Sequence, residues 1–273
     1  MLNIALDLIC VLVFNWGIKG AAIATVFSQF VSAVGIGIYT FIKLREIVPK
    51  KEDMKFEKSN LSTILNLSVM TSVQQSIMNF GILMVQGLVN SFGTVIMAAF
   101  AAAVKIDSFA YMPAEDFGND FSTYVVQNYG AANKDRIKKG IRSSLIASII
   151  FCSIISFFVI VFARQLMCIF INPEEIKIIS AGVKYLYIEG ACYIGIGILF
   201  LLYGYYRAIN KASMLVILTV ISLGTRVLLA YVLSSIPSIG VIGIWVSVPI
   251  GWALADAVGI IYYFISSRKI LVK

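Results

Sequence analysis

The sequence predicts an all-α membrane protein, a polytopic bundle of eight transmembrane helices. Three observations support this class. First, 60% of the 273 residues are hydrophobic and only 13% are charged, whereas soluble domains carry roughly 25% charged residues. Second, the apolar residues form runs long enough to cross about 30 Å of hydrocarbon, which takes roughly 20 helical residues. Third, the basic residues lie in short clusters between these runs, as in the cytoplasmic loops of membrane proteins.

The expected spans follow one another through short connections. They cover residues 2–16, 20–42, 61–87, 93–128, 140–162, 177–208, 212–235 and 241–266. The first is short and carries Asn3 and Asp7. The fourth and sixth are long enough to require tilt, a kink or protrusion into water. Pro113 lies within the fourth run, where it removes a backbone hydrogen bond and is expected to kink the helix.

The basic residues predict the topology. Sixteen of the 22 lysines and arginines fall in the loops 43–58, 134–142 and 207–211 and at the C-terminal end. The opposite side has only Lys19, Arg164, Lys177 and Lys184. Because cytoplasmic loops carry the excess of basic residues, we expect a multi-pass protein of the plasma (inner) membrane with both termini in the cytoplasm. The same clusters account for the net charge of +8, so no nucleic-acid partner is predicted.

The composition excludes several kinds of chemistry. The chain has no histidine, which removes Ser-His-Asp catalysis, histidine-ligated zinc and imidazole pH switches. Its four cysteines have no CxxC spacing, and no GxxxxGK[ST] phosphate loop is present. The sequence therefore predicts no enzyme, no metal site, no cofactor and no ATP-driven pump.

The two ends of the chain look like copies of one another. Gly17-Ile18-Lys19-Gly20 and the following span align with Gly240-Val241-Ile242-Gly243 and its span at an offset of 223 residues. The alternative is that Gly-x-x-Gly turns recur by chance in apolar sequence. Transporters are often built from such repeats. We expect residues 1–45 to be the last two helices of an N-terminal bundle, residues 46–58 a charged cytoplasmic linker, and residues 59–273 a complete six-helix bundle.

Eight short segments match a known pattern. They are Asn3–Asp7, Gly17–Gly20, Gly87–Gly93, Ala98–Asp107, Met112-Pro113, Gln127–Ala131, Ile171–Glu175 and Gly240–Trp252. Together they resemble the multidrug and toxic compound extrusion (MATE) transporters over essentially the whole chain. By this resemblance, the segments from Gly87 to Ala131 correspond to the family's seventh and eighth helices, and the chain holds helices five to twelve.

The resemblance implies a function and several partners. Such transporters have twelve helices in two bundles and export organic cations, driven by a sodium or proton gradient. We therefore expect secondary active, cation-coupled multidrug efflux of small organic cations by an incomplete chain. Its partners would be membrane lipid and the missing N-terminal bundle. A lipid-linked oligosaccharide flippase of the same superfamily and a non-transporting truncated remnant remain alternatives.

Carboxylates inside the spans are the first candidates for substrate or ion binding, because an ionisable group there costs about 2.5–3.5 kcal/mol. Asp107 and Glu189 are both expected near the midplane. Tyr185 and Tyr193 lie one turn on either side of Glu189, which suits an organic cation. The alternative is a carboxylate satisfied by a neighbouring hydroxyl or lysine.

Other polar residues in the spans have two interpretations each. Asp116 and Asp120 share one helix face and form either a proton site or, as we favour, a solvated pair near the cytoplasmic end. Gln74, Gln75, Asn79 and Gln86 form a long polar stripe that either lines an aqueous cavity, as we favour, or joins helices. Related sodium-linked transporters commonly have a glutamate where this stretch has Gln74 and Gln75. Arg226 and Asp256 are expected to form a structural ion pair, with an ion path as the alternative.

Overall fold

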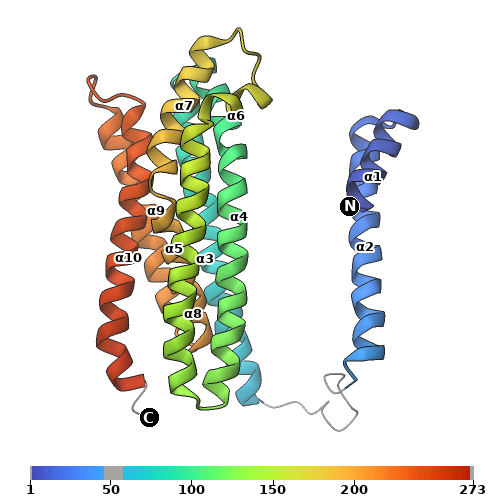
Figure 1. The fold of residues 1–273 in the computed structure, drawn as a ribbon, viewed down its shortest axis with the longest axis vertical. Helices are drawn as coiled ribbons and strands as arrows, with labels where there is room; N and C mark the ends of the chain where they lie inside the picture. The colour runs from blue at the N-terminus through green and yellow to red at the C-terminus, as the bar shows by residue number, and fades with distance from the viewer. Residues whose placement is uncertain (1, 46–57, 271–273) are drawn as a thin grey trace. The chain divides into compact units, whose positions relative to one another are not determined.

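The computed structural model describes residues 2–45 and 58–270, which form helices joined by turns (Figure 1). Contacts divide the chain into two units, Met1–Leu61 and Ser62–Lys273. The predicted charged linker, 46–58, lies outside the described residues except at Lys58, where α3 begins. The first unit has the size expected for the last two helices of another bundle, and that interpretation of residues 1–45 stays a prediction.

The first unit is a helical hairpin. Helix α1, Leu2–Leu8, continues into a short π-helical segment, η1, at Ile9–Val13, and α2 runs from Gly17 to Lys43. Gly17 has a φ of +53°, and Gly20 lies so close to η1 that a Cβ there would come within 3.0 Å of the Cys10 carbonyl oxygen. The Gly-x-x-Gly motif therefore supplies both a left-handed turn residue and the space for close helix packing.

The second Gly-x-x-Gly motif has the same local geometry. Gly240 has a φ of +54°, and a Cβ on Gly243 would lie 2.6 Å from the Cβ of Leu233 in the preceding helix. The two Gly-x-x-Gly motifs thus have the same role in the turn and in helix packing, which explains why the two ends of the chain align in sequence. The larger repeat organisation stays a prediction.

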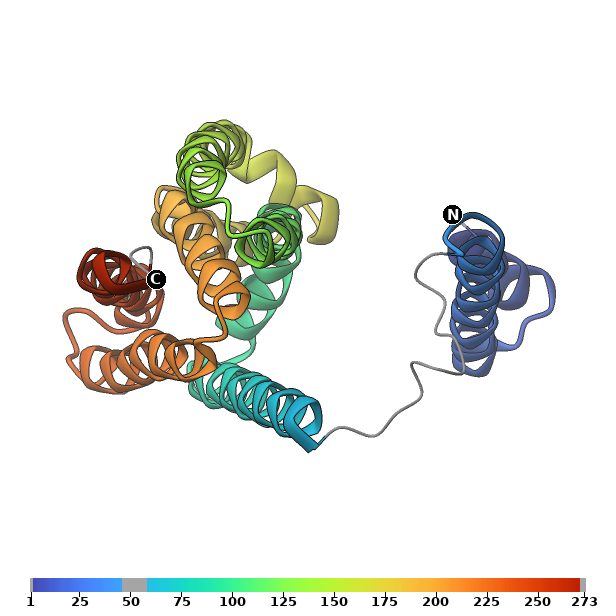
Figure 2. The same cartoon turned by 90° about the horizontal axis from the view of Figure 1, so that it is seen from below.

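The second unit is a bundle of helices that run up and down along its long axis (Figures 1 and 2). Its elements are α3 Lys58–Asn90, α4 Thr94–Gly130, α5 Lys134–Val161, α6 Ala163–Phe170, α7 Ile176–Gly190, α8 Tyr193–Ala208, α9 Ala212–Ser234 and α10 Ile242–Ile270. The most extensive contacts join α9 to α10 and α4 to α8. At the α4–α8 crossing, a Cβ on Gly204 would lie 2.3 Å from the carbonyl oxygen of Gly118, so glycine sets how closely these two helices approach.

Five described helices are long and apolar enough to cross a membrane, namely α2, α4, α5, α9 and α10. Helices α7 and α8 together make a sixth span that is bent by 52° at the break between them. This bend confirms that the long sixth run departs from a straight helix, whereas α4 continues through Pro113. The chain is thus a multi-pass membrane protein with five or six such spans in its described part, and the count of eight stays a prediction.

Candidate functional site

Two carboxyl groups meet in the middle of the second unit. Asp107 on α4 and Glu189 on α7 each lie 13 residues after the first residue of their helix, which is about 20 Å along the axis. Both helices run from the end of the bundle that carries α6 toward the end that carries the C-terminus (Figure 1). The side chains are 9% and 4% exposed respectively. Both residues thus lie at the same depth in the bundle, as predicted, and their carboxyl groups come within hydrogen-bonding reach of each other.

Two tyrosines satisfy both oxygens of Asp107. The Tyr185 hydroxyl donates to Oδ2 at 2.6 Å, and the Tyr193 hydroxyl donates to Oδ1. The sequence suggested that these phenols flank Glu189 on its own helix, but their hydroxyls bind the carboxyl group of a different helix. The reason is the break between α7 and α8, because Tyr185 precedes it, Tyr193 follows it, and both face α4.

Glu189 is the unsatisfied member of the pair. Its Oε1 atom is buried without a hydrogen-bond partner. The rest of its carboxyl group lies within hydrogen-bonding reach of Asp107 and Tyr185. Two carboxylates in contact repel one another strongly in a low-dielectric environment. The arrangement therefore favours occupancy by a cation or a proton shared between the two groups.

The ion pair predicted between Arg226 and Asp256 is not seen in the described part of the chain, and it stays a prediction. In the described part of the chain, Nε of Arg226 and Oδ1 of Asp256 both lack a hydrogen-bond partner, and no interaction between the two residues is seen. Arg226 lies on α9 opposite Gly251 of α10, where a Cβ would lie 3.5 Å from the arginine Cβ. Asp256 is five residues further along α10, or about 7 Å. The guanidinium instead attracts both Asp107 and Glu189.

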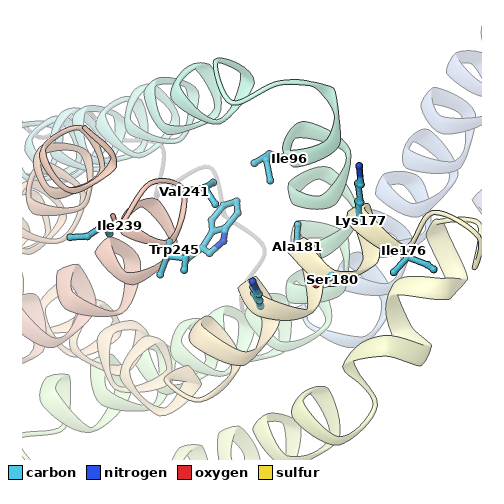
Figure 3. A pocket seen from close by; sticks show the side chains of 10 residues that line it. Ile96, Ile176, Lys177, Ser180, Ala181, Ile239, Val241 and Trp245 are labelled. Carbon is cyan, nitrogen blue, oxygen red and sulfur yellow. The ribbon is translucent and has the colours of Figure 1, made fainter. Parts of the chain in front are cut away.

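An aromatic cluster connects the carboxyl pair to a cavity. Tyr185 meets Trp245 edge-on with ring centroids 5.0 Å apart, and Phe100 stacks on Trp245 at 5.7 Å. Trp245 also lines a cavity of about 460 Å³ between α4, α7 and α10. In Figure 3, Ile96, Val241 and Trp245 point into this space. Neither Phe100 nor Trp245 was predicted as a site residue. Phe100 could have been found, because it lies seven residues before Asp107 on the same face of the helix, whereas no sequence motif marks Trp245.

The cavity is also basic on one side. Lys177 and Lys184 of α7 line it, together with Ser180. The side chains of both lysines are exposed. Helix α7 thus has two lysines beside the cavity. The next residue after Lys184 is Tyr185, which donates to Asp107 of the carboxyl pair.

The remaining predicted residues lie elsewhere. Gln74 and Gln75 line a pocket of about 30 Å³, large enough for a water molecule. Its other polar lining comes from Glu115, Asn119 and Arg207, and Arg207 Nη1 donates to Asn119 Oδ1 at 2.8 Å. We call these five residues the Arg207 cluster.

Three further candidates join neither group. Asn79, Asp116 and Asp120 are exposed, and none of them lines either pocket. Exposure of both aspartates agrees with the solvated interpretation. The structure therefore brings together Asp107, Glu189, Tyr185 and Tyr193 and separates them from the other predicted site residues.

A membrane helix bundle with a broken helix and buried carboxyl groups is the architecture of a transport protein, and comparison with known proteins identifies the family. The family model described as MatE matches residues 68–232, more than half of the chain, and the chain belongs to this family. Its homologues are transporters and not enzymes.

Individual relatives and solved structures agree with this family. The chain is 25% identical over 258 residues to "Probable multidrug resistance protein YoeA" of Bacillus subtilis (strain 168), covering 93% of this chain and 55% of that protein. It is 24% identical over 277 residues to "FAD transporter" of Shewanella oneidensis, covering 98% of this chain and 59% of that protein. The outward-facing structure of a multidrug resistance MATE family transporter matches the fold with a TM-score of 0.92 and 21% identity, over 100% of this chain and 61% of that one. The chain thus spans little more than half the length of these relatives.

Proposed function

We propose that the chain is part of a secondary active multidrug efflux transporter that exchanges organic cations for sodium or protons. Asp107 and Glu189 form its cation site. The observation that carries the proposal is that two buried carboxyl groups from α4 and α7 meet, with Oε1 of Glu189 left without a partner. A bound organic cation would compete with the coupling ion for the same negative charge, and competition of this kind is what antiport requires.

The surroundings of the pair support a drug-binding role. The rings of Phe100, Tyr185 and Trp245 offer aromatic faces between the cavity and the carboxyl groups, and such faces attract organic cations. Helix α7 ends at Gly190, directly after Glu189. A change in the bend at this break would move Glu189 relative to Asp107, which is a means of coupling occupancy to helix movement.

A binding experiment on the chain in lipid nanodiscs tests the site without requiring transport. Wild-type protein is expected to bind ethidium, measured by fluorescence. Glu189→Gln and Asp107→Asn should each weaken binding at least tenfold, because each removes a buried negative charge. Asp120→Asn is the matched control and should bind as the wild type does. Equal affinity in all four proteins would contradict the proposal.

The proposal also includes a membrane topology of eight spans, with both termini in the cytoplasm of a plasma-membrane protein. Lys138, at the start of α5, and Lys177, at the start of α7, should then lie on opposite sides. Each lysine is replaced by cysteine in a chain whose four native cysteines are serine, and an impermeant thiol reagent is added from outside. Only Lys177→Cys is expected to react in intact cells. Labelling of both from outside would overturn this topology.

The chain alone should bind cations without exporting them. Alternating access requires one bundle to rock against another, and residues 1–45 supply only two helices toward an N-terminal bundle. Gradient-dependent ethidium export from vesicles containing only this polypeptide would contradict this expectation. Export only after the missing bundle is supplied would show that the chain is a fragment of a working transporter and not a non-transporting remnant.

A lipid-linked oligosaccharide flippase is the second candidate, and Lys177 and Lys184 are the observation that favours it. Cationic side chains beside an apolar cavity suit the pyrophosphate of such a lipid. Replacing both lysines by glutamine separates the two functions. The double variant should lose binding of a prenyl pyrophosphate if the chain belongs to a flippase, and should keep ethidium binding if it belongs to a drug exporter.

A further inference from the structure

A third carboxyl group is buried in the second unit, apart from the proposed cation site. Asp256 on α10 is 8% exposed, and its Oδ1 atom has no hydrogen-bond partner among the described residues. Its Oδ2 atom lies 3.6 Å from the position that a Cβ on Gly195 would occupy. Gly195 is in the first turn of α8, on the far side of the break from Glu189. Asp256 therefore belongs to the α8–α10 contact and not to the Asp107–Glu189 pair.

The helices that pack against α10 offer Asp256 no cation. These helices are α9, α8 and α7. On α9 the charged residue is Arg226, which lies opposite Gly251 and attracts Asp107 and Glu189. On α8, Arg207 lies twelve residues beyond Gly195, or about 18 Å along the helix, and donates to Asn119. On α7, Lys177 and Lys184 line the outer cavity, and Tyr185 and Glu189 belong to the cation site.

Most of the remaining titratable groups on these helices are phenols. On α8, Tyr203 interacts with Asp256, and its hydroxyl accepts a hydrogen bond from Thr219 Oγ1 at 3.2 Å. Tyr206 donates to the Gly259 carbonyl at 2.7 Å, while Tyr193 donates to Asp107. On α10 itself, Tyr262 packs against Tyr206 and Tyr263 against Tyr205. None of these groups supplies a positive charge.

A carboxylate in this position must exist in its neutral form. An ionised carboxylate loses its hydration on burial, and without a cation or several donors the protein does not replace that hydration. Such a group binds a proton instead. The protonated acid needs no counter-ion, and one unpaired carbonyl-type oxygen is far less costly than an unpaired charge.

We propose that Asp256 is a second proton-binding site of the bundle, separate from the Asp107–Glu189 site. The proton comes from water and forms an O–H bond with the carboxylate. It leaves again, with the bonding electrons remaining on the carboxylate, when water reaches the α8–α10 contact. Gly195 lies one turn from the break between α7 and α8, so movement at this break alters the packing around Asp256. The chain would then carry a proton whether the Asp107–Glu189 site holds a sodium ion, a proton or a drug.

Infrared spectroscopy of the chain in lipid nanodiscs tests this inference directly. A protonated carboxylic acid has a C=O stretching band well separated from the bands of a carboxylate. At neutral pH, Asp256→Asn should remove one such band, and the same loss should appear in an Asp107→Asn background. Asp116→Asn, which changes an exposed carboxylate, should remove none. An unchanged set of protonated-acid bands in Asp256→Asn would overturn the proposal, because Asp256 would then be ionised.

Thermal unfolding provides the second measurement. Exchanging a neutral acid for an isosteric neutral amide should leave the melting temperature of Asp256→Asn close to that of the wild type. A large fall, or failure to fold, would mean that Asp256 is an ionised partner in a salt bridge and would refute the proton site. Neither readout involves transport or drug binding. Loss of ethidium binding in Asp107→Asn with the Asp256 band intact would therefore leave this inference standing while bearing on the proposed function alone.

Discussion

The Asp107–Glu189 pair and the Arg207 cluster both place polar groups against α4, the pair together with α7 and the cluster together with α3 and α8, but their charges balance differently. In the cluster, one acid, Glu115, interacts with one arginine, Arg207. In the pair, two acids share the attraction of Arg226 alone. The first site is neutral when both groups are ionised, whereas the second has an excess negative charge. An excess of buried negative charge calls for a proton or a cation, so only the second site has a physical reason to bind one.

Hydrogen bonding distinguishes the two sites less clearly than charge does. Arg207 Nη1 donates to Asn119 Oδ1 at 2.8 Å, but Arg207 Nε is buried without a partner, and the pocket beside them has only about 30 Å³ of space. At the pair, both oxygens of Asp107 are occupied by phenols while Oε1 of Glu189 is free. The comparison indicates that Asp107 is held in place and Glu189 is available for a ligand. In the Arg207 cluster, the hydrogen bond from Arg207 to Asn119 joins α8 to α4.

Removing the phenols should have the largest effect on stability. The double variant Tyr185→Phe, Tyr193→Phe leaves both oxygens of Asp107 without donors, and each loss is expected to cost about 1–3 kcal/mol of unfolding free energy. Tyr187→Phe is the control, because the Tyr187 side chain is 50% exposed. Unfolding monitored in nanodiscs measures the difference. If the double variant is as stable as the control, Asp107 is not held by these tyrosines.

Neutralising one acid at each site should have opposite effects on stability and on ethidium affinity. Glu189→Gln removes repulsion between two acids and should leave stability equal or higher while ethidium affinity falls at least tenfold, or about 1.4 kcal/mol. Glu115→Gln removes the acid that attracts Arg207 and should lower stability by about 0.5–1 kcal/mol, with ethidium affinity unchanged. Melting temperature and ethidium fluorescence measure the two effects. Reversed results would exchange the roles assigned to the two sites.

The sequence predicted the helices well because apolar run length is a local property. The run 212–235 became α9 at Ala212–Ser234, and the run 93–128 became α4 at Thr94–Gly130. The depth of Asp107 and Glu189 followed from the same local counting. Both residues could therefore be predicted as site residues without knowledge of the contacts between helices.

Contacts between helices depend on register, which the sequence does not supply. An ion pair between Arg226 and Asp256 requires similar depths on α9 and α10, yet close packing at Gly251 places Arg226 about 7 Å from Asp256 along α10. The position of the helix break after Gly190 could not be predicted from the sequence either. That break decides that Tyr193 turns toward Asp107. The predicted ion pair that is not seen among the described residues and the unpredicted partners of Asp107 thus both depend on helix register, which is a nonlocal property.

A loss of about the same size as for Glu115→Gln is expected when Asn119 is replaced. Asn119→Ala removes the acceptor for Arg207 Nη1. Because Asn119 is exposed, water can replace part of this interaction, and we expect a loss of about 0.5–1.5 kcal/mol. Asn119→Asp should restore the acceptor and recover the stability. Failure of the aspartate to recover it would show that the contact adds nothing to the α4–α8 junction.

The smallest effects should come from Asp116 and Asp120, the two aspartates one turn apart on α4. Both are exposed, and exposed substitutions away from specific contacts usually change stability by less than about 0.5 kcal/mol. Asp116→Asn and Asp120→Asn, singly and together, should therefore unfold and bind ethidium as the wild type does. Two carboxylates one turn apart repel one another by only a few tenths of a kcal/mol when water surrounds them, so the double variant should be at most slightly more stable. A tenfold loss of ethidium affinity in the double variant would instead place a cation site on this face of α4, nearer the C-terminal end of the bundle. It would also remove the distinction between a buried pair that we propose as the cation site and an exposed pair that we expect to be solvated.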